Sequence, residues 1–175
     1  MKKINFDKKK GIVFWITGLP GSGKTTVAKL IHKSIQEKFG PTIEISGDNL
    51  RKVFKYKNYD INKRKLYAKK YSEFCNLITS KKVNIIFSTV SLFKEVHIWN
   101  KKNIKNYYEI FIKSDVKKII RLNKKKLYRN KKNIMGVSLK PDFPKKSNLI
   151  IKNDFKISTQ KFAEKILNTI LKDCL

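Results

Sequence analysis

One short pattern restricts the fold of this chain more than any other part of the sequence. Residues Gly18 to Thr25 read G-x-x-x-x-G-K-T, which is typical of a phosphate-binding loop. Glycines let the backbone wrap closely around an anion, because a positive φ costs them little. The amides of such a loop form a concave anion site. The residues that we expect to hold the phosphates are Gly18, Leu19, Pro20, Gly21, Ser22, Gly23, Lys24, Thr25 and Thr26.

The sequence on either side of the loop supports this interpretation. Residues 12–17 are an apolar, β-branched run that suits a buried parallel strand. After the loop, apolar residues recur at helical spacing as far as Phe39. The alternative is a plain glycine turn, but the order of strand, loop and helix favours a nucleotide site. We therefore expect ATP as the ligand, with Lys24 on the β- and γ-phosphates and the Thr25 hydroxyl on Mg²⁺.

Strand and helix patterns alternate along the rest of the chain. Further strands are predicted over residues 42–46, 83–88, 107–112 and 149–151. Helices are predicted over 60–79, 95–102 and 158–171, and another begins after Ser114 as its N-cap. In the helix over 60–79, Asp60 is the expected N-cap, and the expected apolar face consists of Leu66, Phe74, Leu77 and Ile78. This alternation predicts an α/β fold with a parallel sheet and helices on both faces.

Composition sets limits on the class of protein. The 175 residues fit one domain, 1–175, and no apolar run is long enough to span a bilayer. Cys75 and Cys174 lack metal or redox spacing, so we expect free thiols in a cytoplasmic protein. The net charge of +29 raises the alternative of a nucleic-acid-binding ATPase. The basic residues are spread along the whole chain, however, so we expect no specific nucleic-acid partner.

A basic segment over residues 124–146 has weak periodicity and contains Gly136, Pro141 and Pro144. It is either a lid over bound phosphates or a solvated surface loop. Lids commonly accompany phosphate loops because closure excludes water. A second segment, "GDNLR" at residues 47–51, follows the strand over 42–46. Ligands bind outside the carboxyl ends of strands in open α/β sheets, so this segment is a candidate for chemistry.

These segments together resemble the adenylylsulfate kinase family. The resemblance rests on "WITGLPGSGKTTVA", "SGDNLR", "LY" before the basic segment and a late "PDFP". It implies the three-layer fold of P-loop kinases, with about five parallel strands and a lid. It also implies ATP and Mg²⁺ as cofactors and transfer of the γ-phosphoryl group to a ribose 3′-hydroxyl. Members are often homodimers, although no interface can be read from this sequence.

Several of the family's residues are retained. Asp48 and Arg51 stand as in the family's D-G-D-N-x-R, and Arg64 stands as in F-S-x-x-D-R. Ser91 matches the serine of A-F-I-S-P, while Arg129 replaces the lysine of G-L-Y-K. By the resemblance, Asp48 accepts the hydroxyl proton, binds Mg²⁺, or does both. The alternative for Asp48 is a helix N-cap. The arginines would bind acceptor phosphates or close over the transferring group; their alternative is a solvated basic face.

Other family positions differ. Ser46 replaces the leading aspartate, Tyr67 replaces an asparagine, and Thr89 replaces the aromatic residue that stacks on the acceptor's base. The donor side is thus intact, while the acceptor side keeps its arginines and loses groups around adenine. We therefore expect a small-molecule nucleotide acceptor other than adenylyl sulfate. The favoured acceptor is cytidine diphosphoramidate, the substrate of a branch that serves capsule phosphoramidate biosynthesis. A new stacking surface for its base could come from Tyr56, Tyr59, Phe74, Phe87 or Phe93.

Two alternatives remain within the kinases. The first is an adenylylsulfate kinase whose motifs have drifted. The second is another small kinase with a shikimate-like or mononucleotide acceptor, against which the retained "GDN-R" argues.

Overall fold

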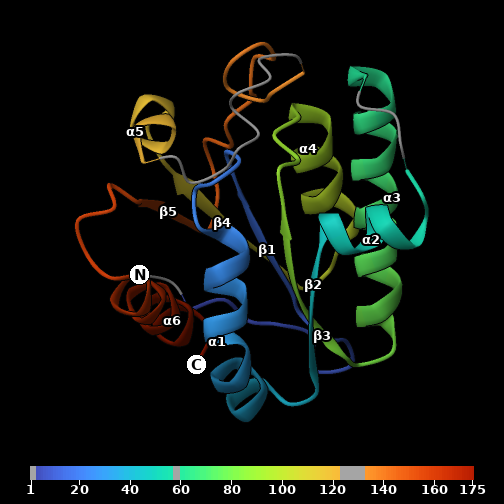
Figure 1. The fold of residues 1–175 in the computed structure, drawn as a ribbon. Coiled ribbons are helices and arrows are strands. Elements are labelled where there is room, and N and C mark those ends of the chain that lie inside the picture. The colour runs from blue at the N-terminus through green and yellow to red at the C-terminus, as the bar shows by residue number, and fades with distance from the viewer. Residues whose placement is uncertain (1–2, 57–59, 123–132) are drawn as a thin grey trace.

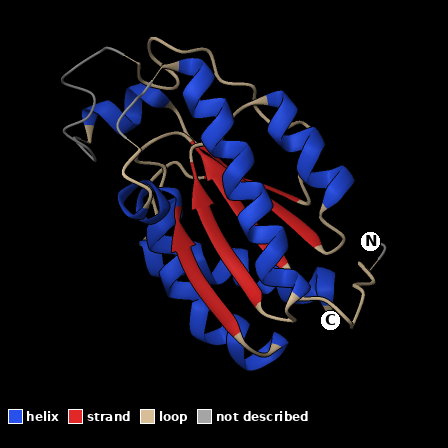
Figure 2. Ribbon diagram, turned by 90° about the vertical axis from the view of Figure 1, so that its right-hand side faces the viewer, coloured by secondary structure: helices blue, strands red, loops and turns tan. Residues whose placement is uncertain are grey.

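The sheet of this protein is fully parallel. The structure, a computed structural model, describes residues 3–56, 60–122 and 133–175. Within them the strands lie in the order β2-β3-β1-β4-β5 (Figures 1 and 2). Their bounds are Val13–Gly18 for β1, Thr42–Ser46 for β2, Asn84–Thr89 for β3, Tyr107–Lys113 for β4 and Leu149–Lys152 for β5. β1 is central and pairs with both β3 and β4.

Helices cover both faces of the sheet and complete three layers, as predicted (Figure 1). α1 and α6 pack on one face, and α3 and α4 pack on the other. α2 follows directly on β2, and α5 follows β4. The bounds are Lys24–Phe39 for α1, Gly47–Val53 for α2, Ile61–Ser80 for α3, Lys94–Asn103 for α4, Val116–Arg121 for α5 and Thr159–Cys174 for α6.

The central strand β1 is apolar on both sides, because both of its faces are covered. Val13 and Trp15 point into the core under α3 and α4, whereas Phe14 and Ile16 point into the core under α1 and α6. All four side chains are fully buried. This is the pattern that a continuous apolar run produces in a parallel sheet. The burial fixes the end of β1, and with it the start of the glycine-rich loop.

Two helix starts test the capping predictions. Asp60 does cap α3, since its carboxylate accepts a hydrogen bond from the Lys63 amide at 2.9 Å. The prediction for Ser114 is wrong, because Asp115 caps α5 instead and accepts from the Lys117 amide at 2.8 Å. Either side chain has the chemistry of a cap, so local sequence does not separate them.

The predicted apolar face of α3 is partly wrong. Leu66 and Leu77 are 44% and 58% exposed, respectively. Phe74 and Ile78 pack against the core as predicted, and the buried part of the same face contains Ala68, Tyr71, Ser72, Cys75 and Thr79. Small side chains on this face allow α3 to lie close to the sheet, and the leucines are left facing outward. This rotation decides which α3 side chains reach the ends of the strands.

Both cysteines are free thiols, as expected. Burial raises the pKa of the Cys75 thiol well above its usual range and that of Cys174 to about 12. In the parts of the chain that the structure describes, no helix has the length and apolarity needed to cross a bilayer.

A buried carboxylate joins α4 to β4 and to the segment before β5. Glu109 is fully buried and accepts hydrogen bonds from His97 Nδ1 at 2.7 Å, the Tyr107 hydroxyl at 3.0 Å and the Ser147 hydroxyl at 2.9 Å. The Lys101 ammonium lies 3.6 Å from its second oxygen. Burial alone would raise the pKa of Glu109, but His97, with Ser147 and Lys101, lowers it below its usual range.

This network predicts an acid-sensitive contribution to stability. The folded-state pKa of Glu109 is depressed, so its contribution is complete above the ordinary carboxyl pKa, about 4.3, and is lost as pH falls through the folded value. At neutral pH, Glu109→Gln should lower the unfolding free energy by about 3 kcal/mol, since it breaks a buried pair. Urea denaturation from pH 3 to pH 7 measures this, and the gap between the two proteins should narrow in acid. Glu73→Gln, which alters an exposed pair, is the control. A gap that stays constant with pH would contradict the assignment.

Candidate active site

The glycine-rich loop lies between the end of β1 and the first turn of α1. Gly21 and Gly23 have φ values of 79° and 98°, a region that side chains disfavour. Lys24 begins α1 and is 6% exposed. Its ammonium donates to the Leu19 carbonyl at 2.7 Å and lies 3.5 Å from the Ser22 hydroxyl. The loop therefore holds its lysine across the turn, next to backbone amides and the helix N-terminus.

A residue that the sequence did not single out supports this loop. Asn153 directly follows β5 and is buried. Its amide nitrogen donates to the Ser22 carbonyl at 3.0 Å, and its oxygen accepts from the Phe155 amide at 3.0 Å. A lone asparagine after a short strand carries no motif, so only the structure identifies it. It ties the loop to the far edge of the sheet.

The junction of β2 and α2 places a carboxylate beside the loop. Ser46 caps α2 in a reciprocal arrangement, in which its hydroxyl accepts from the Asn49 amide at 3.2 Å and its own amide donates to Asn49 Oδ1 at 2.8 Å. The alternative that Asp48 is the N-cap is therefore wrong. Asp48 lies in the first turn with its carboxylate 63% exposed, and it is 3.6 Å from the Arg51 guanidinium. Its carboxylate is available to a ligand.

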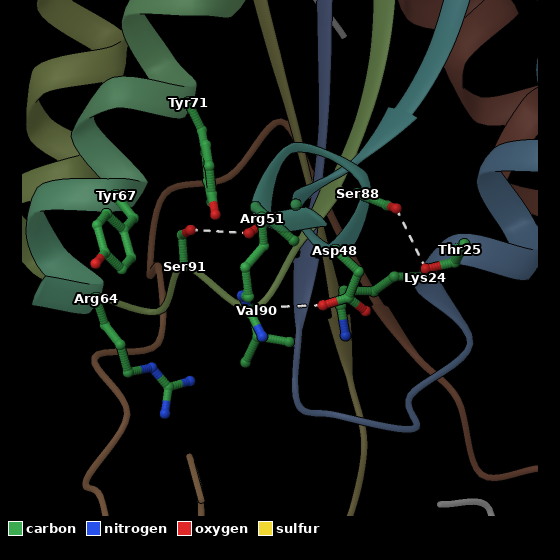
Figure 3. Close-up of a pocket in the computed structure, with 12 residues that line it drawn as sticks. Lys24, Thr25, Asp48, Arg51, Arg64, Tyr67, Tyr71, Ser88, Val90 and Ser91 are labelled. Carbon is green, nitrogen blue, oxygen red and sulfur yellow. Dashed lines mark hydrogen bonds and ion pairs between the residues drawn. The ribbon is translucent and has the colours of Figure 1, made fainter. Parts of the chain in front are cut away.

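These segments enclose one cleft at the carboxyl edge of the sheet (Figure 3). Its empty volume is about 620 Å³, open solvent at the mouth included. Of the predicted site residues beyond the loop, the structure brings Asp48, Arg51, Arg64 and Ser91 to this cleft. Among the described residues, the lining consists of Lys24, Thr25, Gly47, Asp48, Arg51, Arg64, Tyr67, Tyr71, Ser88, Thr89, Val90 and Ser91.

The oxygen atoms at one end of the cleft suit a hard cation. The Thr25 hydroxyl lies 3.3 Å from the Ser88 hydroxyl, and the Asp48 carboxylate faces the same space (Figure 3). Hydroxyl and carboxylate oxygens suit Mg²⁺, which keeps several waters and binds through few protein ligands. The described residues contain no cluster of three or more histidine, cysteine or acidic side chains. The donor set fits the expected metal at Thr25 and Asp48.

The other end of the cleft is aromatic. The sequence placed Tyr67 at a position of the resembled family's acceptor motif but proposed neither Tyr67 nor Tyr71 as a stacking ring. Tyr67 and Tyr71 reach it from α3. Burial raises the pKa of the Tyr71 phenol, although the nearby Arg51 guanidinium acts in the opposite direction, so Tyr71 is a neutral phenol. Of the aromatic candidates predicted from sequence, Phe87 and Phe93 are buried in the core.

The remaining aromatic candidates lie either outside the cleft lining or outside the described residues. Phe74 packs against the core, Tyr56 stacks behind Tyr67, and Tyr59 lies outside the described residues. The candidates that the structure describes do not line the cleft, because the rotation of α3 brings Tyr67 and Tyr71 to the strand ends instead. The candidate Tyr59 stays a prediction.

The described part of the predicted lid packs against the site. Arg64 donates from Nη1 to the Asn133 carbonyl at 2.7 Å. At Gly136, with φ of 88°, an added Cβ would lie 2.7 Å from a terminal methyl of Leu19, so this segment lies directly on the phosphate loop. Residues 123–132, and Arg129 with them, lie outside the described residues. A lid over 124–146 therefore stays a prediction.

A family model and curated relatives identify the family of this chain. The family described as adenylylsulphate kinase matches residues 10–152. A cytidine diphosphoramidate kinase of Campylobacter jejuni is 32% identical over 168 residues, 93% of this chain and 98% of that protein. An adenylyl-sulfate kinase of Thermodesulfovibrio yellowstonii is 28% identical over 169 residues, 92% of this chain and 84% of that protein.

Among solved structures, the APS kinase of Mycobacterium tuberculosis in complex with AMPPNP and APS is similar to this chain with a TM-score of 0.81. The two are 22% identical, and the match covers 93% of this chain and 98% of that one. This likeness concerns the fold.

The loop geometry predicts that Lys24→Ala weakens ATP binding by about ten-fold or more, because it removes a charge-assisted contact to the phosphates. The measurement is titration with a fluorescent ATP analogue. Lys33→Ala, an exposed lysine on the same helix, is the matched control and should bind normally. Thermal melting of both variants checks the fold. Unchanged affinity in a folded Lys24→Ala protein would remove this lysine from the donor site.

Proposed function

Because the chain belongs to the adenylylsulphate kinase family, we propose that it transfers the γ-phosphoryl group of ATP to the ribose 3′-hydroxyl of cytidine diphosphoramidate. The observation that carries this proposal is a single cleft that contains an intact phosphate-loop end and an altered acceptor end. The 32% identity to the Campylobacter jejuni kinase over nearly all of both chains supports the same acceptor. On this proposal the reaction contributes to a capsule phosphoramidate.

The donor is held by the loop. The amides of residues 21–25 and the Lys24 ammonium would bind the β- and γ-phosphates at the N-terminus of α1. Thr25 and Asp48 would hold Mg²⁺, which when bound neutralises charge on those phosphates. Asn153 keeps the loop in register with β5 through its bond to the Ser22 carbonyl.

The acceptor occupies the rest of the cleft. Arg51 and Arg64 would pair with its anionic diphosphoramidate tail, since guanidinium groups bind phosphoryl oxygens in bidentate fashion. Because the diphosphoramidate tail is anionic, this acceptor still needs both arginines of the resembled family, although its base is cytosine and not adenine. Ser91, whose hydroxyl lies 2.9 Å from that of Thr89, supplies a further polar contact near the tail.

The chemical step is an in-line displacement. The ribose 3′-oxygen attacks the γ-phosphorus, the bond from that phosphorus to the bridging oxygen of ADP breaks, and ADP leaves with the electron pair. Asp48 takes the hydroxyl proton. It is well placed because its exposed carboxylate and the Lys24 side chain line the same cleft. The protein's task in such a reaction is mainly positioning and charge neutralisation.

A second acceptor deserves a direct comparison. The matched family and the Thermodesulfovibrio yellowstonii relative are adenylylsulfate kinases, which favours adenylyl sulfate as the alternative acceptor. Against it, Thr89 and Tyr67 stand where that family carries an aromatic residue and an asparagine.

Homodimer formation, common in the family, is a separate proposal that sedimentation can test.

The proposal is tested by an acceptor screen with ATP and Mg²⁺, in which phosphorus NMR locates the new phosphate. We expect a 3′-phosphate on cytidine diphosphoramidate and a much lower rate with adenylyl sulfate. The reverse preference would assign the alternative. Turnover that needs no nucleotide acceptor but is stimulated by RNA or DNA would instead support a nucleic-acid-dependent ATPase.

The proposed base gives a prediction for turnover. Asp48→Asn should lower kcat by about 10²-fold or more, because a positioned base contributes roughly that much, while ATP affinity changes less. Steady-state kinetics and ATP titration measure the two effects. Asp115→Asn is the control, since asparagine still caps α5. Normal turnover in Asp48→Asn would show that this carboxylate takes no part in the chemistry.

The proposed tail site gives a prediction for substrate selectivity. Arg51→Ala and Arg64→Ala should each raise the acceptor KM by about ten-fold and leave the ATP KM nearly unchanged, because each removes a charge-assisted pair on the acceptor side. Initial-rate kinetics with each substrate varied in turn measures this. Arg121→Ala, on α5 and outside the cleft lining, is the control. Equal effects on both substrates would argue against acceptor-side roles.

A further inference from the structure

A stacked pair of tyrosines forms one wall of the cleft. The rings of Tyr56 and Tyr67 are parallel within 4°, and their centroids are 3.8 Å apart. Tyr71, one turn further along α3, lies 6.5 Å from Tyr56 between ring centroids. Tyr67 lines the cleft and is half-buried, while Tyr56, which is not among the lining residues, stacks on one face of its ring. The pair fixes the Tyr67 ring by packing, so its surface is preorganised.

This aromatic surface is unusual within its surroundings. The rest of the lining is mostly charged or hydroxyl-bearing, with Val90 as a small apolar exception. Charged and hydroxyl groups suit phosphates and ribose, but they do not suit the flat face of a base. Bases bind proteins by stacking on aromatic rings. The two tyrosines therefore provide a binding surface for the base, which the other lining residues do not.

The order of residues along the cleft agrees with this division. Figure 3 shows Tyr67, Tyr71 and Arg64 on the α3 side, Lys24 and Thr25 on the opposite side, and Asp48 and Arg51 between them. A nucleotide whose ribose lies near Asp48 would have its tail within reach of the arginines and its base toward α3. In this orientation the ribose would be the part of the acceptor that lies next to the γ-phosphate of ATP.

The position of Tyr67 in the sequence adds an independent argument. Thr89, at the end of β3, replaces the aromatic residue of the resembled family, and Tyr67 replaces an asparagine. Both residues line the same cleft. The aromatic surface has thus been lost from the strand end and gained on the helix. A base that stacks on α3 would lie differently from one that stacks at the end of β3.

We propose that Tyr67, held by its stack with Tyr56, is the specificity-determining surface for the acceptor's base, on which a pyrimidine ring stacks. This rests on the proposed function for the identity of the base. Tyr67 makes a binding contact, and Asp48 and Lys24 carry the chemistry. The contribution of Tyr67 is therefore to acceptor affinity and selectivity.

The test measures base recognition by calorimetry, without turnover. The protein is saturated with AMPPNP and Mg²⁺ to fill the donor site, and then titrated with CMP or with ribose 5-phosphate, which lacks the base. The ratio of the two dissociation constants isolates the contribution of the base. The wild type should favour CMP by about ten-fold or more, as expected for one base stacked on one ring.

Three variants separate the ring from other effects. Tyr67→Leu should lose most of the preference for CMP and bind ribose 5-phosphate as before. Tyr67→Phe should keep the preference, since it retains the ring and removes the hydroxyl. Leu66→Ala, at the neighbouring exposed position of α3, is the matched control and should behave as wild type. If Tyr67→Leu does not fold, Tyr67→Asn, which restores the family's side chain, replaces it.

Several results would overturn the inference. They are a wild type that binds CMP and ribose 5-phosphate equally, a Tyr67→Leu variant that keeps the preference, or a Tyr67→Phe variant that loses it. The outcome is independent of the transfer assay. A preference for CMP that depends on Tyr67, found in a protein that phosphorylates a different cytidine nucleotide, would sustain this inference and reject the proposed acceptor.

Discussion

The parallel pairing of β1, β2 and β3 is the constraint on which the site depends. Ser88 of β3 is in register with Ile16 of β1 on one side and with Ser46 of β2 on the other. All three strands therefore end at the same edge of the sheet. The phosphate loop leaves from β1, the helix with Asp48 leaves from β2, and the segment with Ser91 leaves from β3. Residues far apart in the chain share one cleft because the strands end together.

The sequence predicted the strand, loop and helix of the donor half well, because their signals are local. A buried parallel strand is apolar throughout, and a phosphate loop needs glycines, lysine and a hydroxyl at fixed spacing, so both can be read from consecutive residues. The acceptor half of the site is harder to predict from the sequence. Tyr67 and Tyr71 reach the cleft because of the rotation of α3, which buries Ala68 and Cys75 against the sheet. The pattern of leucines suggested another face, and nothing in the sequence alone outweighed it. Likewise, Asn153 acts through a contact to Ser22, which lies 131 residues away in the chain.

The charges that line the cleft indicate the position of the site better than the net charge of the whole chain does. Among the described lining residues, Lys24, Arg51 and Arg64 are the cations and Asp48 supplies the carboxylate. On the proposed function, such a field would attract the phosphates of both substrates and leave one group to take up a proton. The net charge of +29 is spread along the sequence and does not locate the site. The tyrosines of the acceptor end belong to α3, whereas Lys24 and Asp48 follow β1 and β2. The base-binding end can therefore change in sequence without a change in the groups proposed for phosphoryl transfer.

The most direct test of the central claim is a crystal structure with AMPPNP, Mg²⁺ and CDP bound together. The account predicts the triphosphate in the loop over residues 18–25 and the CDP ribose in the same cleft, with its 3′-oxygen facing the γ-phosphorus and within hydrogen-bonding distance of Asp48. A ternary complex in which the two nucleotides lie in separate cavities, or in which the 3′-oxygen points away from the γ-phosphorus and Asp48, would contradict it.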